Sequence, residues 1–548
     1  MSETNYNWLT FSEEFGEETV NLIKCIFENK EQHRANLFID ANTGKGKSYF
    51  IKGMLYEYCK ENKLKMLYLL PRRIVRDEFI KELQAENKTD VITVKAYQEF
   101  EQREDYSSYE EYLRIEENKS LKKYDIIICD ECHYFISDST FNSFTFRSYD
   151  HIFSEGADKL KIFITATPEP VSVKIYGTIC QHNSKDIPEE EWHYLAYCKA
   201  EGVSPVKDID FFKVGYSELK QQNVQKIIDK IDKTEDKAIV FCDSKSDALE
   251  LHEKYKENSL FICSMSSEKK DKYFKANAVN ENPEAYFKML SEHKFDCKYV
   301  FCTSALDVGF SIRDRQVKHI ICMLQDWNGV IQAVGRKRIM NNDINDRVTL
   351  YLPYYSNQTI GKKRKENIAL FEHYKCLDIY GAEAYMKKYE KIPDPAKIVY
   401  YRHTGNGTCE PAIDNFVWWY YMRQNQVWNE ISKIDSPEKH QDWICQQFGL
   451  RSKSHERTLY GIERDLKPFA DSKRIFTQKD KQIIVDIINH KNKNNGLQVK
   501  TMAKLEEYLQ KIGCRYMIFI DSKRETIDGK DKKTTTYQIV ERPTGQDE

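Results

Sequence analysis

Short, uninterrupted apolar runs alternate with longer helical stretches over the first third of the chain. Between about Phe11 and Val171 the expected strands are Asn36–Ile39, Lys65–Leu70, Asp90–Val94, Asp125–Cys129 and Lys161–Thr165. Their apolar content is continuous rather than alternating, which is typical of parallel strands buried on both faces. The alternation of such strands with helices predicts an α/β domain over residues 1–175.

A second series of the same kind begins near Tyr216. Its expected strands are Ala238–Cys242, Ser259–Cys263, Lys298–Cys302, His319–Met323 and Arg347–Tyr351. This series predicts a second α/β domain over residues 216–355. Residues 176–215 show few periodic signals, and we interpret them as a linker or a small insertion.

The pattern becomes mainly helical beyond Tyr354, which predicts a helical extension over residues 356–475. In the last segment, 476–548, we expect two helices, Thr477–His490 and Val499–Ile512. A β-hairpin follows, with strands Cys514–Asp521 and Thr534–Val540 around Asp528-Gly529. Helices followed by a two-stranded wing suggest a winged-helix module, and generic α+β packing is an equally good interpretation.

Composition narrows these possibilities only a little. With 548 residues, 41% of them hydrophobic and 31% charged, the chain is expected to fold into several domains. Its net charge is −2, so any nucleic-acid contact must rest on a local surface. Residues 471–548 carry 16 basic and 12 acidic side chains, a mildly basic balance.

The sequence also bears on the cellular compartment. No apolar run approaches the roughly 20 residues that span a bilayer, and the first residues lack a signal-peptide pattern. The 15 cysteines have no repeating spacing, which is typical of thiols in a reducing compartment. We expect a cytoplasmic protein without a membrane partner.

The octapeptide Ala41–Ser48 follows the apolar run Leu37–Ile39 and precedes a helical stretch. Glycines at 44 and 46 let consecutive backbone N–H groups turn toward phosphate oxygens, and the helix N-terminus favours the same anion. Lys47 can reach the β- and γ-phosphates, and the Ser48 hydroxyl can bind Mg²⁺. The expected nucleotide-binding residues are Thr43, Gly44, Lys45, Gly46, Lys47 and Ser48.

The tetrapeptide Asp130-Glu131-Cys132-His133 follows another apolar run, Ile126–Cys129. A carboxylate at the position of Asp130 can hold Mg²⁺, usually through water. Glu131 can then orient or deprotonate the water that attacks the γ-phosphate. His133 has two interpretations, a link to the second domain or a polar residue at the end of the strand, and the context favours the link.

These two motifs and several others, in this order, resemble superfamily 2 helicases of the DExH/DEAD-like type. The resemblance covers about Phe11 to Tyr354 and implies two tandem RecA-like parallel-sheet domains. Besides Ala41–Ser48 and Asp130–His133, the matching motifs are Pro71-Arg72-Arg73, Lys95–Gln98, Thr165-Ala166-Thr167, Val240–Ser244, Thr303–Gly309 and Gln332–Arg338. Each motif alone is weak, whereas the ordered set is specific.

The resemblance implies a role for each motif. ATP and Mg²⁺ would lie between the two domains, with Lys47, Ser48, Asp130 and Glu131 on one wall. The other wall would supply Gln332, Arg336, Arg338 and Gly309. Thr165 and Thr167 would couple the domains together with His133. The residues expected to contact a nucleic-acid backbone are Arg72, Arg73, Thr303 and Ser304.

Two departures from the family pattern leave questions open. The second arginine of the last motif usually stands three residues after the first, but that position is Ile339 here and Arg338 comes one residue early. Either Arg336 or Arg338 could therefore act as the arginine finger. An adenine-reading glutamine upstream of the octapeptide is not evident, so other triphosphates are possible substrates.

The sequence thus predicts an ATP-dependent nucleic-acid helicase or translocase, with DNA favoured over RNA and a possible protein partner for the C-terminal region. The composition suits replication of a phage or mobile element, or defence. The alternative is a nucleic-acid-stimulated ATPase switch that remodels a partner without unwinding. A P-loop NTPase acting on protein alone is disfavoured by the motifs at Thr303–Gly309 and Gln332–Arg338. Trp418–Tyr421 could stack bases, but their apolar helical context favours a place in the core.

Overall fold

The computed structural model of the 548-residue chain describes residues 9–28, 35–101, 115, 117–142, 144–185, 192–213, 217–264, 271–304, 311–354, 357–389, 398–403, 409–433, 443–445, 447–448, 459–477, 480–488, 499–511, 514–527 and 530–542. The chain divides into two compact units, Met1–Lys433 and Ile434–Glu548. Each unit is described below by itself.

The first unit begins with a six-stranded sheet in the order β3-β2-β4-β5-β1-β6, in which every pairing is parallel. Its strands are β1 Ala35–Ala41, β2 Met66–Leu70, β3 Ile92–Ala96, β4 Ile126–Asp130, β5 Leu160–Thr165 and β6 Tyr194–Ala200. The five strands expected from the apolar runs are therefore present, and four of them are buried along almost their whole length.

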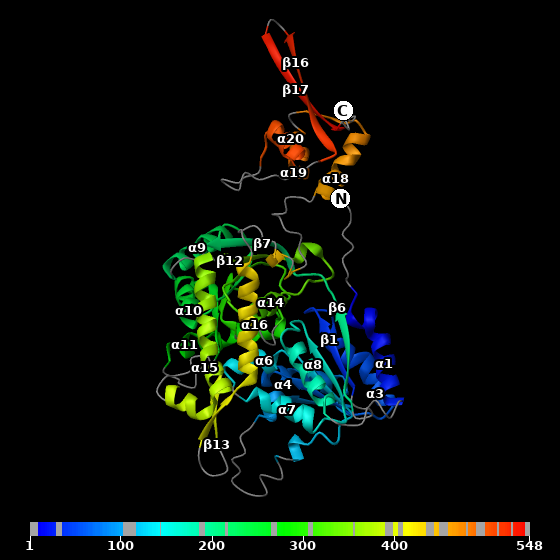
Figure 1. Cartoon of the computed structure of the whole chain (residues 1–548), viewed down its shortest axis with the longest axis vertical. Coiled ribbons are helices and arrows are strands. Elements are labelled where there is room, and N and C mark those ends of the chain that lie inside the picture. The colour runs from blue at the N-terminus through cyan, green and yellow to red at the C-terminus, as the bar shows by residue number, and fades with distance from the viewer. Residues whose placement is uncertain are drawn as a thin grey trace. The chain divides into compact units, whose positions relative to one another are not determined.

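Helices cover both faces of this sheet (Figure 1). On one face lie α1 Glu17–Glu28, the continuous helical segment α2-η3-α3 over Lys47–Glu61, and α4 Arg73–Ala85. On the other face lie α7 Thr145–Ser154 and α8 Val171–Asn183. A sheet covered on both sides explains why its strands are apolar without alternation.

The second sheet has the order β7-β12-β11-β8-β10-β9 and is also parallel throughout. Its strands are β7 Val206–Lys213, β8 Lys237–Phe241, β9 Ser259–Ile262, β10 Tyr299–Cys302, β11 Val317–Cys322 and β12 Val348–Tyr354. The helices that accompany it include α9 Ser217–Ile231, α10 Lys245–Lys254, α13 Pro283–Glu292 and α14 Trp327–Gly335. Two six-stranded parallel sheets in sequence are the arrangement of tandem RecA-like domains.

The segment 176–215 differs from the expected linker or small insertion. It contributes β6, which pairs with β1 of the first sheet, and β7, which pairs with β12 of the second. Both strands lie at sheet edges, and Tyr194 and Tyr197 of β6 are 44% and 53% exposed. An edge strand with one solvated face lacks the continuous apolar run that marks the inner strands, so the sequence pattern did not reveal it.

The remainder of the first unit is a mainly helical extension that also contains a short hairpin. Helix α15 Asn357–Tyr389 bends at Gly381, where φ is 79°. The hairpin of β13 Val399–His403 and β14 Cys409–Ile413 leads into α16 Asn415–Ser432, which packs along α15 (Figure 1).

The aromatic segment of α16, Trp418–Tyr421, is partly buried and packs against two core clusters. Phe416 is buried against the α7–α8 face of the first sheet, and Trp419 and Tyr420 pack against the same cluster. Trp418 stacks on Tyr374 of α15 with ring centroids 5.0 Å apart. These contacts show the rings packing against neighbouring elements, and Tyr420 also lines the cavity between the α/β domains.

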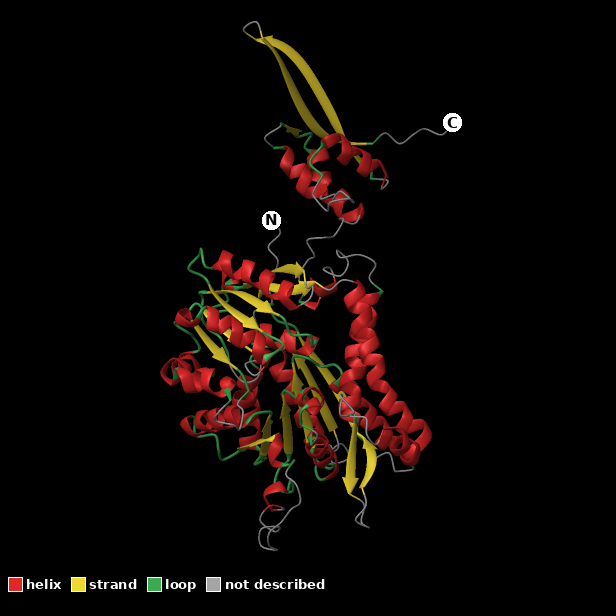
Figure 2. Cartoon of the chain, turned by 90° about the vertical axis from the view of Figure 1, so that its left-hand side faces the viewer, coloured by secondary structure: helices red, strands yellow, loops and turns green. Residues whose placement is uncertain are grey.

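The C-terminal unit contains α18 Leu459–Asp471, β15 Ile475–Phe476, α19 Lys481–Ile488, α20 Met502–Lys511, β16 Tyr516–Ile527 and β17 Lys530–Glu541. The two expected helices and the hairpin are present, and the hairpin strands are longer than expected. The strands form an antiparallel sheet in the order β15-β17-β16. Figure 2 shows the hairpin extending well beyond the helices of this unit.

Among the residues that the structure describes, there is no helix with the length and apolar character needed to cross a membrane.

Candidate active site

The phosphate loop connects β1 to the helical segment that starts at Lys47. Gly44 and Gly46 have φ values of 85° and 80°, in the left-handed region that favours glycine. Lys47 Nζ donates to the carbonyl oxygen of Ala41 at 2.8 Å, across the mouth of the loop. The lysine ammonium is therefore held over the backbone that would surround a phosphate.

Lys45 plays a different part from the one expected. Its Nζ lies 2.6 Å from a carboxylate oxygen of Glu14, and its side chain is only 2% exposed. The backbone carbonyl of Lys45 also accepts from Phe11 N at 2.6 Å. The side chain and the backbone carbonyl of Lys45 thus fasten the loop to the N-terminal helical segment.

The carboxylates that follow β4 lie at the same edge of the sheet, because β4, β5 and β1 are neighbours and run in the same direction. Asp130 is fixed by two tyrosines, Tyr97 from the motif Lys95–Gln98 and Tyr68, which the sequence analysis did not single out. The Tyr68 hydroxyl donates to Asp130 Oδ2, and the Tyr97 hydroxyl donates to the Asp130 carbonyl at 2.9 Å. Glu131 has a φ of 48°, which turns its side chain away from the strand direction.

The charges of this site perturb one another. Burial raises the pKa of Asp130 to about 6, helped by the charge of Glu131. Burial also acts to raise the pKa of Glu131, but the hydrogen bond of His133 and the charge of Lys47 outweigh it and hold that pKa below its ordinary value. Burial lowers the pKa of Lys47, opposed by both carboxylates. Such mutual perturbation in a buried cluster is typical of functional sites.

The oxygen donors at this edge fit Mg²⁺. A serine hydroxyl and a carboxylate are ligand types that Mg²⁺ accepts, with the rest of its octahedron taken by phosphate oxygens and water. Ser48 and Asp130 offer this pair. Among the described residues no group of three or more His, Cys, Asp and Glu side chains could hold a metal ion by itself. An ion here would therefore depend on the phosphates of the nucleotide.

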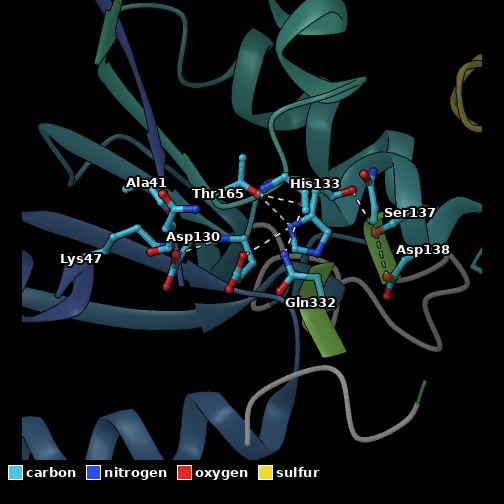
Figure 3. A network of polar contacts seen from close by, with 12 residues as sticks. Ala41, Lys47, Asp130, His133, Ser137, Asp138, Thr165 and Gln332 are labelled. Atoms are coloured by element: carbon cyan, nitrogen blue, oxygen red, sulfur yellow. Dashed lines mark hydrogen bonds and ion pairs between the residues drawn. The ribbon is translucent and has the colours of Figure 1, made fainter. Parts of the chain in front are cut away.

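A chain of hydrogen bonds leads from Glu131 to the second sheet's domain (Figure 3). His133 Nδ1 lies 3.4 Å from Glu131 Oε2 and 3.0 Å from Thr165 Oγ1. The Thr165 hydroxyl lies 3.3 Å from that of Thr167, which accepts from Gln332 Nε2 at 3.2 Å. Gln332 in turn accepts from Arg336 Nη2 at 3.1 Å. All three residues expected to couple the domains are members of this chain.

Helix α14 brings the second wall directly against the phosphate loop. A Cβ at Gly335 would stand 2.4 Å from Thr43 Oγ1, so only glycine allows this approach. One guanidinium nitrogen of Arg338, Nη1, lies 3.3 Å from the place where a Cβ on Gly44 would be. The two walls expected from the motifs therefore meet at the loop.

The two arginines of α14 and its C-terminal turn have different surroundings. Arg336 is bound to Gln332, whereas Arg338 Nη1 is buried with no hydrogen-bond acceptor among the described residues. Burial and the neighbouring Arg336 lower the pKa of Arg338 to about 10. Lys337 between them points away and pairs with buried Asp346 at 2.6 Å. Arg338 Nε donates to Ser311 Oγ at 3.2 Å, and Nη1 of the same guanidinium lies beside the phosphate loop.

Most of the residues expected to contact nucleic acid, namely Arg72, Thr303 and Ser304, line a cavity of about 1600 Å³ between the two α/β domains. His133 and Gln332 of the hydrogen-bonded chain line it as well. Arg73 is exposed at the start of α4 and does not line this cavity. Gly309 lies outside the described residues. Arg72 is ion-paired with Asp138, which joins it through Ser137 to the His133 carbonyl (Figure 3).

The cavity lining also contains two aromatic rings that sequence reasoning missed. Phe141, after β4, is 66% exposed, and Phe287 on α13 is 58% exposed. Both rings thus offer apolar surface to a molecule in the cavity. Isolated aromatic residues in polar stretches give no periodic signal, so the sequence alone could not assign them.

Comparison with known families adds one finding. Residues 11–170 match the family model described as type III restriction enzyme, res subunit. Residues 11–170 form a DExH/DEAD-like superfamily 2 helicase-type domain. This domain contains the phosphate loop, the Asp130–His133 tetrapeptide and the two coupling threonines, and it belongs to the helicase and ATPase superfamily. The search of curated proteins gave no match to the chain.

Proposed function

We propose that the protein is an ATP-dependent nucleic-acid helicase or translocase that hydrolyses ATP between its two α/β domains. The observation that carries this proposal is the joining of both walls at one loop: Gly335 touches Thr43, and Gln332 is hydrogen-bonded to Thr167. A helicase-type domain alone would account for ATP binding. The residues of α14 and the turn after it would complete a hydrolysis site, and this site would form only when the two α/β domains lie against each other.

In the proposed reaction the backbone N–H groups of residues 43–48 surround the phosphates, and Lys47 neutralises the β- and γ-phosphates. Mg²⁺ held by Ser48 and Asp130 would neutralise phosphate charge and orient the γ-phosphoryl group. Glu131, kept ionised by His133 and Lys47, takes the proton of the attacking water. Arg338 stabilises the charge that develops on the transferred group.

Nucleic acid would bind in the cavity between the domains. Its lining has more carboxylates than ammonium or guanidinium groups, so hydroxyl groups and rings are the better candidates for contact. Thr303 and Ser304 can donate to backbone oxygens, and Phe141 and Phe287 can stack on unpaired bases. The route from Arg72 through Asp138 and Ser137 to His133 gives this cavity a physical connection to the ATP site.

A direct test is the ATPase rate with single-stranded DNA, duplex DNA and RNA, measured beside strand displacement. We expect one nucleic acid to stimulate turnover and a tailed duplex to be unwound. The Lys47→Ala variant should lose both activities, since no other group replaces its ammonium. Full ATPase activity in that variant would overturn the assignment of the loop. Unaltered turnover with every nucleic acid would overturn the proposal as a whole.

The second candidate function is a nucleic-acid-stimulated ATPase switch that remodels a partner. The same test separates it, because a switch is stimulated without displacing a strand.

We also propose that the C-terminal unit is a winged-helix module. Its order of elements and its β15-β17-β16 sheet support this interpretation.

A further inference from the structure

A second, smaller pocket of about 230 Å³, which we call the extension pocket, adjoins the cavity between the α/β domains. The two spaces are adjacent because four residues line both of them: Thr140, Gln325, Asp326 and Tyr420. The other residues of its lining come from α15 and α16, namely Lys363, Glu366, Asn367, Tyr421, Gln424 and Trp428. The helical extension therefore supplies most of the wall of this pocket.

Three aromatic side chains line the extension pocket. Tyr420 and Tyr421 are partly buried, and Trp428 is buried. The ammonium of Lys363 lies 5.6 Å from the centre of the Trp428 ring and donates to the side-chain oxygen of Gln325. Aromatic side chains are the surfaces on which proteins stack the planar rings of unpaired bases. The wall of the pocket therefore suits a flat ring.

An unused hydrogen-bond donor also belongs to this wall. Asn367 Nδ2 is buried and has no acceptor among the residues that the structure describes. A buried donor without an acceptor costs free energy, which a bound acceptor would recover. The nearby amide of Gln325 is already engaged, because it accepts from Lys363 and donates to Asp243 at 2.7 Å. Asn367 is thus the amide that can bind an oxygen or ring nitrogen of a ligand.

The charges of the lining disfavour a phosphate inside the pocket. Asp326 and Glu366 supply two carboxylates, against one ammonium from Lys363. Asp326 is the N-cap of α14 and accepts from two backbone N–H groups, so its oxygens are already used. An uncharged ring with hydrogen-bond acceptors fits this lining better than an anion does.

The size of the pocket and its surroundings suit a single nucleotide unit. Sites for drug-sized ligands have volumes of about 300–1,000 Å³, and this pocket is smaller. Beside it α15 begins with the basic run Lys362–Lys365, in which Lys362 and Lys365 are exposed. Exposed positive charge favours a phosphate backbone. The base of one nucleotide could therefore lie in the pocket while its phosphates stay outside.

We propose that the extension pocket binds one unpaired nucleobase, which stacks on its aromatic wall and accepts a hydrogen bond from Asn367. The base belongs to the strand that lies in the adjacent cavity, so this inference rests on the proposed function and deepens it. The extension would then hold the strand by a base at the point where it leaves the two α/β domains.

The test measures strand affinity of the full-length protein without ATP, by fluorescence anisotropy. The probes are oligothymidylate and oligouridylate, each beside an abasic strand of the same length and sugar, which keeps the phosphates and lacks the bases. We expect Asn367→Leu to weaken binding of the preferred base-carrying strand about three- to tenfold, the effect of one lost hydrogen bond. Its affinity for the abasic strand should equal that of the parent protein.

Two further variants and a melting experiment separate binding from structure. Asn367→Ala should show the same selective loss, and Asn415→Ala, at an exposed asparagine of α16, is the matched control with parent affinities. Because Asn367 Nδ2 has no acceptor among the described residues, Asn367→Leu should keep or raise the melting temperature. A lower melting temperature with equal losses for both kinds of strand would reveal a structural role and overturn the inference.

Other results would also overturn it. One is unchanged affinity for the base-carrying strand in both Asn367 variants. Another is weaker binding of labelled free thymidine monophosphate in Asn367→Leu with strand affinity intact, which would assign the pocket to a free nucleotide. Parent protein that binds no strand at all would contradict the proposed function together with this inference, whereas strand binding that no Asn367 variant alters would contradict the inference alone.

Discussion

At the scale of single residues, the nucleotide site depends on groups whose neighbours set their charge. Glu131 is kept ionised by His133 and Lys47, while burial raises the pKa of Asp130 to about 6. Two adjacent carboxylates therefore differ in character, and this difference supports separate roles for them.

Glu131→Gln should bind ATP with little change and hydrolyse it about 10²–10⁴ times more slowly, because the amide cannot take the proton of the water. Single-turnover ATPase assays beside equilibrium binding of labelled ATP separate the two effects. Glu57→Gln, on the exposed side of α3, should have the parent rate. Parent turnover in Glu131→Gln would show that another group acts as the base.

Arg338→Ala should lower kcat by a factor of about 10³ or more relative to the parent protein, because an arginine finger contributes about 10³–10⁵ to the rate. Arg336→Ala should lower kcat by less. The reason is that Arg338 reaches the phosphate loop while Arg336 holds Gln332. The measurement is kcat for both variants, with exposed Arg315→Ala as the control. A larger loss in Arg336→Ala would reverse the assignment.

At the scale of elements, α16 is the helix of the extension that packs both against the first α/β domain and along α15. Its N-cap is Asp414, which is buried and accepts from Phe416 N at 3.0 Å and Val417 N at 3.2 Å. Burial raises the pKa of Asp414 to about 6, and the two backbone hydrogen bonds oppose this shift. The Asp414 carboxylate thus stabilises the helix by accepting two hydrogen bonds, whereas burial of its negative charge is unfavourable.

The stability of the first unit should accordingly depend on Asp414 in a defined direction. Its pKa is higher in the folded than in the unfolded chain, so the folded state binds the proton first and is favoured as the pH falls through about 6. Asp414→Asn keeps the capping acceptor without this charge. The melting temperature of the parent protein should rise relative to that of Asp414→Asn between pH 8 and pH 5.

Asp414→Ala should lower the free energy of unfolding of the first unit by about 1 kcal/mol at every pH, because the helix loses its N-cap. A difference between the parent protein and Asp414→Asn that stays constant with pH would contradict the proposed titration.

At the scale of the whole first unit, α16 also bridges the two α/β domains. Arg423 is paired with Glu169 at 2.8 Å on the first domain. Gln424 donates to Asp326, the N-cap of α14, on the second. The helix that carries Gln332 is therefore held in place by the extension as well as by the coupling threonines.

Removal of this bridge in Arg423→Ala with Gln424→Ala should lower the ATPase rate without nucleic acid and leave the saturated rate nearly unchanged. The unliganded domains would less often occupy the arrangement that places Arg338 at the loop, whereas a bound strand would restore it. ATPase titrations with nucleic acid measure both rates, and exposed Gln426→Ala is the control. An unaltered basal rate would show that the bridge does not position α14.

Features that depend on nearby residues could be predicted from the sequence. Continuous apolar runs identify the inner strands because burial on both faces excludes polar residues. The glycines at 44 and 46 identify the phosphate loop because a left-handed turn needs them. The edge strands β6 and β7 were not predicted, because half-exposed strands lack a continuous apolar run.

Local sequence patterns thus sufficed to predict the two α/β domains and to propose the residues of the nucleotide site. The tertiary structure decided which side chains reach it. Lys45 turns to Glu14, Arg338 reaches the loop in place of position 339, and Tyr68 and Tyr97 fix Asp130. Each of these contacts joins residues that are far apart in the sequence, so the local order of residues does not reveal it.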